Sequence, residues 1–184
     1  LDLQGPEASR VLMDLGLASA RVPSYYRSAQ VDLLGHSLLL SRTGYTGELG
    51  FELYVPAAEA RDLWRGILTH DAVNPAGLGA RDTLRLEMGY PLHGHELDDD
   101  TTPVEAGFGR LLSPEGHDHL AADALRRPPR KELIGLALGG RRAARPGMTI
   151  RGEREEKGLG VVTSGSFAPS VGCAVALAYV HAGS

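Results

Sequence analysis

The chain has 184 residues, which is enough for one large domain or two small ones with a buried core. Its hydrophobic content of 42% and charged content of 23% are ordinary for a globular protein, and its formal charge of −4 argues against nucleic-acid binding. A single cysteine, Cys173, excludes internal disulfides and favours a reducing compartment, and no apolar run has the length of a membrane helix.

The first part of the chain predicts a mixture of strands and helices. Residues 1–5 are typical of the end of a strand, and Pro6 and Glu7 are typical of the first turn of a helix through residue 12. Alternation and helical spacing then predict two strands, His36–Arg42 and Leu49–Val55, joined by a turn at Gly44 and Gly47, and two helices, 57–69 and 78–88.

The second part predicts a change of architecture. Residues 102–105, Thr-Pro-Val-Glu, have the pattern of a capping box and predict the start of a short helix. Residues 113–130 are polar and proline-rich, which indicates a linker. Four short strands are expected beyond it, at Glu132–Leu138, Met148–Arg151, Gly160–Thr163 and Ala174–Val180. The chain is therefore expected to divide into a domain at 1–112, a linker at 113–130 and a small all-β domain at 131–184.

Glu52 stands inside an apolar strand pattern, which raises the question of what it faces. In residues 41–55, SRTGYTGELGFELYV, Phe51 and Leu53 share one strand face while Glu52 and Tyr54 share the other. One interpretation is an edge strand with a solvated outer face. The other is a cleft whose ligand presents paired N–H donors, as guanidinium groups and pterin rings do, because an ionised carboxylate accepts two such hydrogen bonds.

Arg81 and Arg85 are four residues apart and share one face of the helix expected at 78–88. Ordinary surface charge is one interpretation, with Asp82 and Glu87 as neighbours of the two arginines. The other is an arginine directed at a carboxylate of a ligand near the Glu52 face.

Residues 93–100, HGHELDDD, hold two histidines and four acids, but their spacing does not match a metal site. The histidines are two apart around a glycine, and three of the acids are contiguous rather than alternating. A solvated acidic loop is the favoured interpretation, and no metal is expected.

Three long motifs follow one another along nearly the whole chain: SRTGYTGELGFELYVP, GLGARDTLRLEMGYPLHGHELDDDTTPVEAGFGR and VVTSGSFAPSVGCAVALAYV. Together they resemble the aminomethyltransferase (T-protein) family of the glycine cleavage system. The resemblance implies an α+β chain that is part of the family's folate-binding cloverleaf, with half of a mixed α/β domain followed by a small barrel-like β domain.

The resemblance also implies a reaction and its participants. T-proteins transfer the one-carbon unit of an aminomethyl group from the dihydrolipoyl arm of H-protein to tetrahydrofolate and release ammonia. The implied partners are lipoylated H-protein and tetrahydrofolate, with no metal, nucleic acid or membrane. The implied location is the cytoplasm, or the mitochondrial matrix in a eukaryote.

Four residues match ligand-binding positions of the family. Glu52 corresponds to the glutamate that binds the pterin and Arg81 to the arginine of the folate or substrate site, while Tyr45 and Tyr90 match tyrosines near the ligand. The family's first third, which carries the aspartate thought to be catalytic, and its tail beyond Val180 have no counterpart here. No catalytic residue is therefore assigned, and the 184 residues alone are expected to be inactive.

Three other functions remain open from the sequence. The same module occurs in flavin-dependent demethylating dehydrogenases that act on dimethylglycine or sarcosine. A folate-binding module of iron–sulfur cluster maintenance is disfavoured, because that group carries a cysteine-bearing glycine motif where this chain has Gly44-Tyr45-Thr46-Gly47. A structural β domain without a ligand is the third.

Overall fold

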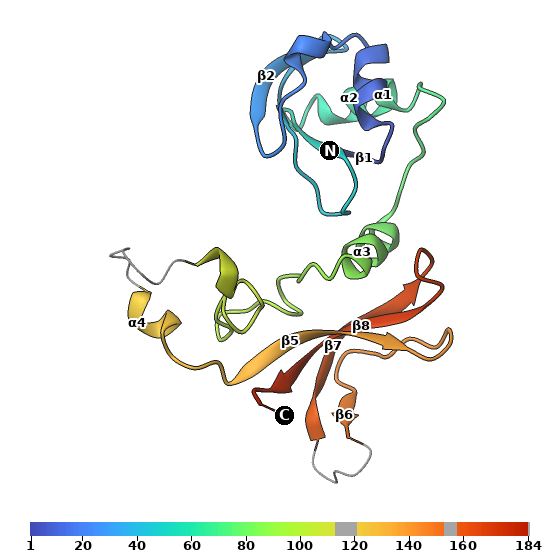
Figure 1. Cartoon of the computed structure of the whole chain (residues 1–184). Coiled ribbons are helices and arrows are strands. Elements are labelled where there is room, and N and C mark those ends of the chain that lie inside the picture. Colours follow the sequence, from blue (N-terminus) through green and yellow to red (C-terminus); the bar gives the residue numbers. More distant parts are fainter. Residues whose placement is uncertain (113–120, 153–157, 184) are drawn as a thin grey trace. The chain divides into compact units, whose positions relative to one another are not determined.

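The computed structural model describes residues 1–112, 121–152 and 158–183. It contains two compact units, Leu1–Arg81 and Asp82–Ser184, and each of them has its own sheet (Figure 1). The linker and domain limits expected from the sequence stay a prediction, and residues 113–120 of that linker lie outside the described residues.

The first unit is built on a four-stranded antiparallel sheet in the order β1-β4-β3-β2. Its strands are β1 Asp2–Gln4, β2 Ser28–Leu33, β3 His36–Ser41 and β4 Gly50–Tyr54. Its helices are α1 Ala8–Asp14, the 3₁₀ turn η1 Ser19–Arg21 and α2 Ala60–Ile67. The two strands expected from alternation form close to their expected limits, and β2 is an additional strand.

One face of this sheet is buried beneath the two helices. Leu12 of α1 and Leu63 of α2 join Leu40 and Phe51 of the sheet in a single cluster, and all four are fully buried. Because side chains alternate along a strand, the buried set leaves Glu52 and Tyr54 on the opposite face. The helices therefore cover one face, and the candidate ligand-binding residues of β4 lie on the other.

The second unit is built on another antiparallel sheet, in the order β5-β8-β7-β6. Its strands are β5 Lys131–Leu138, β6 Thr149–Arg151, β7 Gly158–Ala168 and β8 Cys173–His181. Two short helices, the 3₁₀ helix η2 Gly109–Leu111 and the α-helix α4 Ala122–Leu125, precede the sheet. Helices with an antiparallel sheet in one unit and a four-stranded β sheet in the other confirm the expected α+β class.

Helix α3, Leu78–Glu87, contains the division between the units, since Arg81 closes the first and Asp82 opens the second. Its outward residue Leu78 is 84% exposed, whereas Arg85 and Leu86 near its end are buried in the second unit. None of the helices in the described part of the chain combines the length and apolar character of a membrane span.

The expectation of a short helix from residue 103 is wrong, although its capping box forms. The N–H of Glu105 donates to Oγ1 of Thr102 at 3.2 Å, and the N–H of Thr102 donates to Oε2 of Glu105 at 2.9 Å. One turn follows, closed by the N–H of Ala106 on the carbonyl of Thr102. Gly107 then adopts φ 84°, a left-handed conformation that ends helices, so the segment stays a turn.

The buried carboxylate of Glu105 also binds Arg130, next to the start of β5. Both the backbone N–H and Nε of Arg130 donate to Oε1, at 3.1 and 3.2 Å. Burial by itself raises the pKa of Glu105, but the hydrogen bonds from Thr102 and Arg130 outweigh it and lower the pKa from 4.5 to about 2.

We expect this carboxylate to make the second unit sensitive to acid. Because the pKa is depressed in the folded state, its stabilising contribution is complete above pH 4.5 and is lost as the pH falls towards 2. Glu105→Gln should cost on the order of 2 kcal/mol at pH 7, and that difference from the unsubstituted chain should shrink between pH 4.5 and 2. Amide hydrogen exchange of β5 in the two proteins measures it.

Glu132→Gln is the matched control, because Glu132 is exposed on β5 and its replacement should change stability by less than about 0.5 kcal/mol. A Glu105→Gln difference that stays constant from pH 7 to the acid limit would contradict the assignment of this acid sensitivity to Glu105.

Candidate functional site

Glu52 lies on an inner strand, so its interpretation as an edge-strand residue is wrong. β4 runs between β1 and β3, and Glu52 is opposite Asp2 on one side and Ser41 on the other. The hydroxyl of Thr43 makes a short hydrogen bond to Oε2 of Glu52, and Tyr54 Oη lies 3.3 Å from the same oxygen. The half-buried carboxylate is thus held in place at the centre of the sheet face that the helices leave uncovered.

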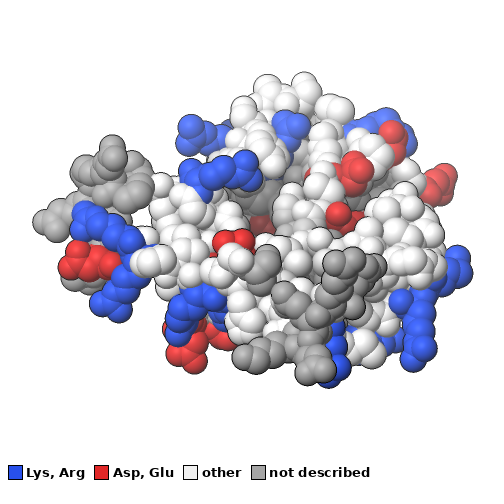
Figure 2. All heavy atoms as spheres, turned by 60° about the horizontal axis from the view of Figure 1, so that its bottom comes forward, with Lys and Arg blue, Asp and Glu red and all other residues white. Residues whose placement is uncertain are grey.

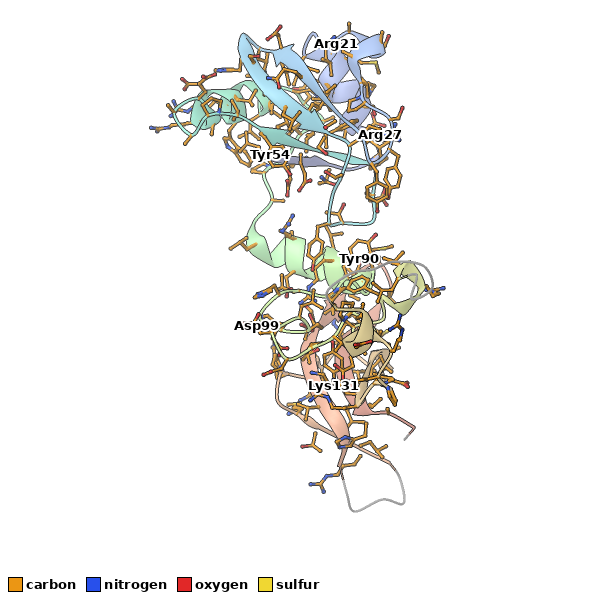
Figure 3. The ribbon with its side chains drawn as sticks, turned by 90° about the vertical axis from the view of Figure 1, so that its left-hand side faces the viewer. Arg21, Arg27, Tyr54, Tyr90, Asp99 and Lys131 are labelled. Atoms are coloured by element: carbon orange, nitrogen blue, oxygen red, sulfur yellow. The ribbon has the colours of Figure 1, made fainter. Side chains whose placement is uncertain are left out.

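The negative charge of Glu52 acts on its neighbour Tyr54, which Figure 3 labels on β4. That charge is the largest cause of the raised pKa of Tyr54, with further contributions from burial, the hydrogen bond to Glu52 and the charge of Asp2. The tyrosine therefore keeps its proton and can donate to the carboxylate.

Arg81 is brought to the same face through Asp2. Its Nη1 lies 2.7 Å from Oδ2 of Asp2, the residue directly opposite Glu52 in β1. Its guanidinium carbon also lies 4.9 Å from the centre of the Tyr45 ring, which is the geometry of a cation–π contact. Arg81 thus already holds one carboxylate, and both partners of that ion pair are more than a third exposed to solvent.

Tyr45 belongs to the loop between β3 and β4, and the glycines of this loop have two different roles. Gly47 adopts φ 79°, so a turn explains it. Gly44 and Gly50 do not adopt a left-handed conformation, and a β-carbon at either position would collide with the side chain of Gln4. The turn expected from the sequence therefore accounts for Gly47 but not for Gly44.

These contacts place Glu52, Arg81 and Tyr45 in one neighbourhood of the first unit. A carboxylate has about four acceptor positions and a guanidinium has five donors, so the pair matches a ligand with an amidine-like N–H edge and an anionic group. Tyr90, the fourth expected residue, is in the second unit, where its carbonyl accepts a hydrogen bond from Arg85 at 3.1 Å (Figure 3).

Asp2 is the member of this neighbourhood that sequence reasoning missed. Its alternation with the buried Leu3 was visible in the sequence. The pairing of β1 with β4, which places Asp2 beside Glu52, joins residues 50 positions apart and has no local signal.

Arg85 has a different environment from Arg81, although the two share a helical face. Its guanidinium is 1% exposed and binds Glu96 at 3.0 Å, Ser164 at 2.8 Å and Asp82 at 2.8 Å. Glu96 is fully buried and also accepts hydrogen bonds from the Leu92 N–H and the Ser164 hydroxyl, at 2.9 and 2.6 Å. Asp82 is a surface neighbour of Arg85, as the surface-charge interpretation expected. The same interpretation is wrong for Arg85 itself, because its side chain is buried.

The segment at 93–100 holds this buried Glu96 rather than a uniformly solvated acidic loop. Its neighbour His95 contacts the carbonyl of Thr163 at 3.3 Å. Among the described residues, no group of three or more histidine, cysteine or acidic side chains is close enough to hold a metal ion.

Figure 2 shows one face of the molecule with the described basic and acidic side chains coloured. Blue and red groups are interspersed with uncharged surface on that face, and the described basic side chains form no continuous stripe there. On this face, the described residues therefore show no continuous basic footprint of the kind that nucleic-acid binding requires.

Comparison with known proteins agrees with this architecture. The model of the GCVT N-terminal domain matches residues 1–115, and that of the glycine cleavage T-protein C-terminal barrel domain matches residues 131–184. An N-terminal domain of this kind followed by the barrel domain defines a T-protein-type chain. The protein belongs to the glycine cleavage T-protein family.

Curated relatives carry the name aminomethyltransferase. One from Moorella thermoacetica is 46% identical over 100% of this chain, and one from Rubrobacter xylanophilus is 44% identical over 98%. The crystal structure of glycine cleavage system aminomethyltransferase T from Bartonella henselae matches 98% of the chain with a TM-score of 0.86 and 35% identity. The chain spans about half the length of these relatives, between 49% and 51%.

Proposed function

We propose that the complete protein containing this chain is the aminomethyltransferase of glycine cleavage. It would transfer the one-carbon unit from the aminomethyl-dihydrolipoyl arm of H-protein to tetrahydrofolate, with release of ammonia. Membership of the T-protein family and the aminomethyltransferase names of the relatives support the reaction class. The observation that carries the site is the placement of Glu52 beside Asp2 and Arg81 on the uncovered sheet face.

The residues present fit tetrahydrofolate in the chemistry of their donors and acceptors. Glu52 would accept the paired N–H donors of the pterin chiefly on Oε1, because the hydroxyls of Thr43 and Tyr54 already bond to Oε2. Arg81 would bind a carboxylate, as it does here with Asp2, and Tyr45 would pack beside it. Tetrahydrofolate, when bound, supplies the nitrogen that takes up the one-carbon unit.

The proposed partners and location follow from the same family. Lipoylated H-protein would deliver the aminomethyl group, and Tyr90 of the second unit is proposed to lie near the ligand. The cytoplasm is the proposed location, or the mitochondrial matrix in a eukaryote.

Transfer by the complete protein should be measurable directly. With aminomethylated H-protein and tetrahydrofolate, it should release ammonia and form 5,10-methylenetetrahydrofolate, whereas the 184 residues alone should not, because they span about half of the relatives. Ammonia release and folate absorbance follow the reaction, and omission of tetrahydrofolate is the control. Absence of turnover in the complete protein, with folate and H-protein both bound, would refute the proposed reaction.

A further inference from the structure

The side chain of Gln4 is enclosed by the loop that carries Thr43 and Tyr45. Gln4 is the last residue of β1 and is opposite Gly50 of β4. A β-carbon added to Gly44 would stand 2.8 Å from Cδ of Gln4, and one added to Gly50 would stand 2.6 Å from its Nε2. Real β-carbons do not approach other atoms so closely, so glycine at both positions leaves the space that Gln4 fills.

The amide of Gln4 makes hydrogen bonds to two residues of this loop and to one residue of β4. Its Nε2 donates to the carbonyl of Thr43 at 3.3 Å and to the carbonyl of Phe51 at 3.4 Å. Its Oε1 accepts from the hydroxyl of Thr46, which is buried, at 3.2 Å. One side chain from β1 therefore joins the beginning of the loop, its middle and the first part of β4.

The same loop supplies two contacts of the candidate site. Thr43 donates its short hydrogen bond to Glu52, and Tyr45 lies beneath the guanidinium of Arg81. Gln4 reaches this loop through the backbone carbonyl of Thr43 and the hydroxyl of Thr46, and these bonds leave the Thr43 hydroxyl to Glu52 and the Tyr45 ring to Arg81.

We propose that Gln4 is a positioning residue of the ligand site: it holds the loop so that Thr43 meets Glu52 and Tyr45 meets Arg81, and thereby sets the affinity for folate. This inference rests on the proposed function. A residue that acts through others in this way lowers affinity when it is replaced, even where the fold is kept.

Gln4→Met tests this in the complete protein, because methionine keeps the length of the side chain and removes its hydrogen bonds. The dissociation constant for tetrahydrofolate should rise about ten-fold, as expected for the loss of two or three modest hydrogen bonds. Gln30→Met is the matched control, because Gln30 is an exposed glutamine of β2 whose side chain lies 3.4 Å from Ser37. If Gln4→Met does not fold, Gly44→Ala is the substitute test, because its β-carbon crowds the same Gln4 amide.

A double-mutant cycle separates positioning from a merely structural role. If Gln4 acts through the contacts of Thr43 and Tyr45, then in a background that carries both Thr43→Val and Tyr45→Ala, Gln4→Met should change folate affinity by less than about three-fold. Equal ten-fold effects in both backgrounds, or unchanged affinity in a folded Gln4→Met protein, would overturn the proposal.

Failure of the proposed function gives a different result. A complete protein that binds no folate would refute the function, and the loop would then be examined by the backbone amide signals of residues 43–49 in an NMR spectrum. These signals should shift in Gln4→Met and not in Gln30→Met. Unchanged signals in Gln4→Met would overturn the positioning role, whatever the ligand.

Discussion

Glu96→Ala is expected to destabilise the second unit by about 3–5 kcal/mol, the largest change of stability among these substitutions. The substitution removes the buried carboxylate that pairs with Arg85, and the guanidinium, which is 1% exposed, would keep as an acidic partner the half-exposed Asp82. Leu92 N–H and the Ser164 hydroxyl would lose their acceptor at the same time. A buried charge without its partner costs far more than the pair contributes when intact.

Replacing Arg85 and Glu96 together provides the comparison with the single Glu96→Ala variant. Arg85→Met with Glu96→Leu removes the two buried charges together, so the double variant should be more stable than Glu96→Ala alone. The exposed pair Arg126–Asp123 is the control, since its side chains are 56% and 93% exposed and Arg126→Ala should change stability by less than about 0.5 kcal/mol.

The measurement must report on the second unit. The single tryptophan, Trp64, is in α2 of the first unit, so its fluorescence does not do so. Amide hydrogen exchange along β8 gives the local free energy of opening. A loss of protection below about 1 kcal/mol in Glu96→Ala would show that the network contributes little.

Glu52→Ala is expected to weaken tetrahydrofolate binding by ten-fold or more in the complete protein. Each charge-assisted hydrogen bond from a ligand to a carboxylate is worth about 1.5–3 kcal/mol, and the pterin would make two. The fold should be unaffected, because Glu52 is on the uncovered face and the core residues Phe51 and Leu53 are kept. Equilibrium titration with tetrahydrofolate measures the change.

Two further variants sharpen this result. Asp32→Ala is the control, because Asp32 is an exposed carboxylate of β2 on the same sheet face as Glu52. This substitution should leave the affinity for tetrahydrofolate unchanged. Arg81→Ala should lower kcat/KM for transfer, since it removes the cation that here binds Asp2. A folate affinity that is the same with and without Glu52 would remove this residue from the site.

Local patterns predicted β3 and β4 of the first unit because their alternation is regular. β3 and β4 alternate buried and exposed residues, and their limits agree with those expected to within one residue at each end. β2 was missed although Val31 and Leu33 alternate in it, because its hairpin turns at Leu34 and Gly35 with Leu34 at φ 52°, which an apolar side chain rarely adopts.

Long-range pairing explains the other differences. β7 runs to Ala168, well past the limit expected at Thr163, because residues 164–168 pair with β8 despite their polar sequence. A register shift between Val162 and Ser164 accompanies the burial of Ser164 against Arg85. Similarly, the spacing of Arg81 and Arg85 predicted a common helical face. It could not predict that Arg81 would pair with Asp2 and Arg85 with Glu96, because both partners lie outside that helix.

Because the amide of Gln4 fills the volume that β-carbons at Gly44 and Gly50 would need, a larger residue at either glycine requires the Gln4 side chain to move. Among natural variants, alanine at either glycine should occur together with a shorter residue in place of Gln4. A directed-evolution library that randomises the loop while holding Gln4 constant should therefore accept fewer substitutions at these two glycines than a jointly randomised library.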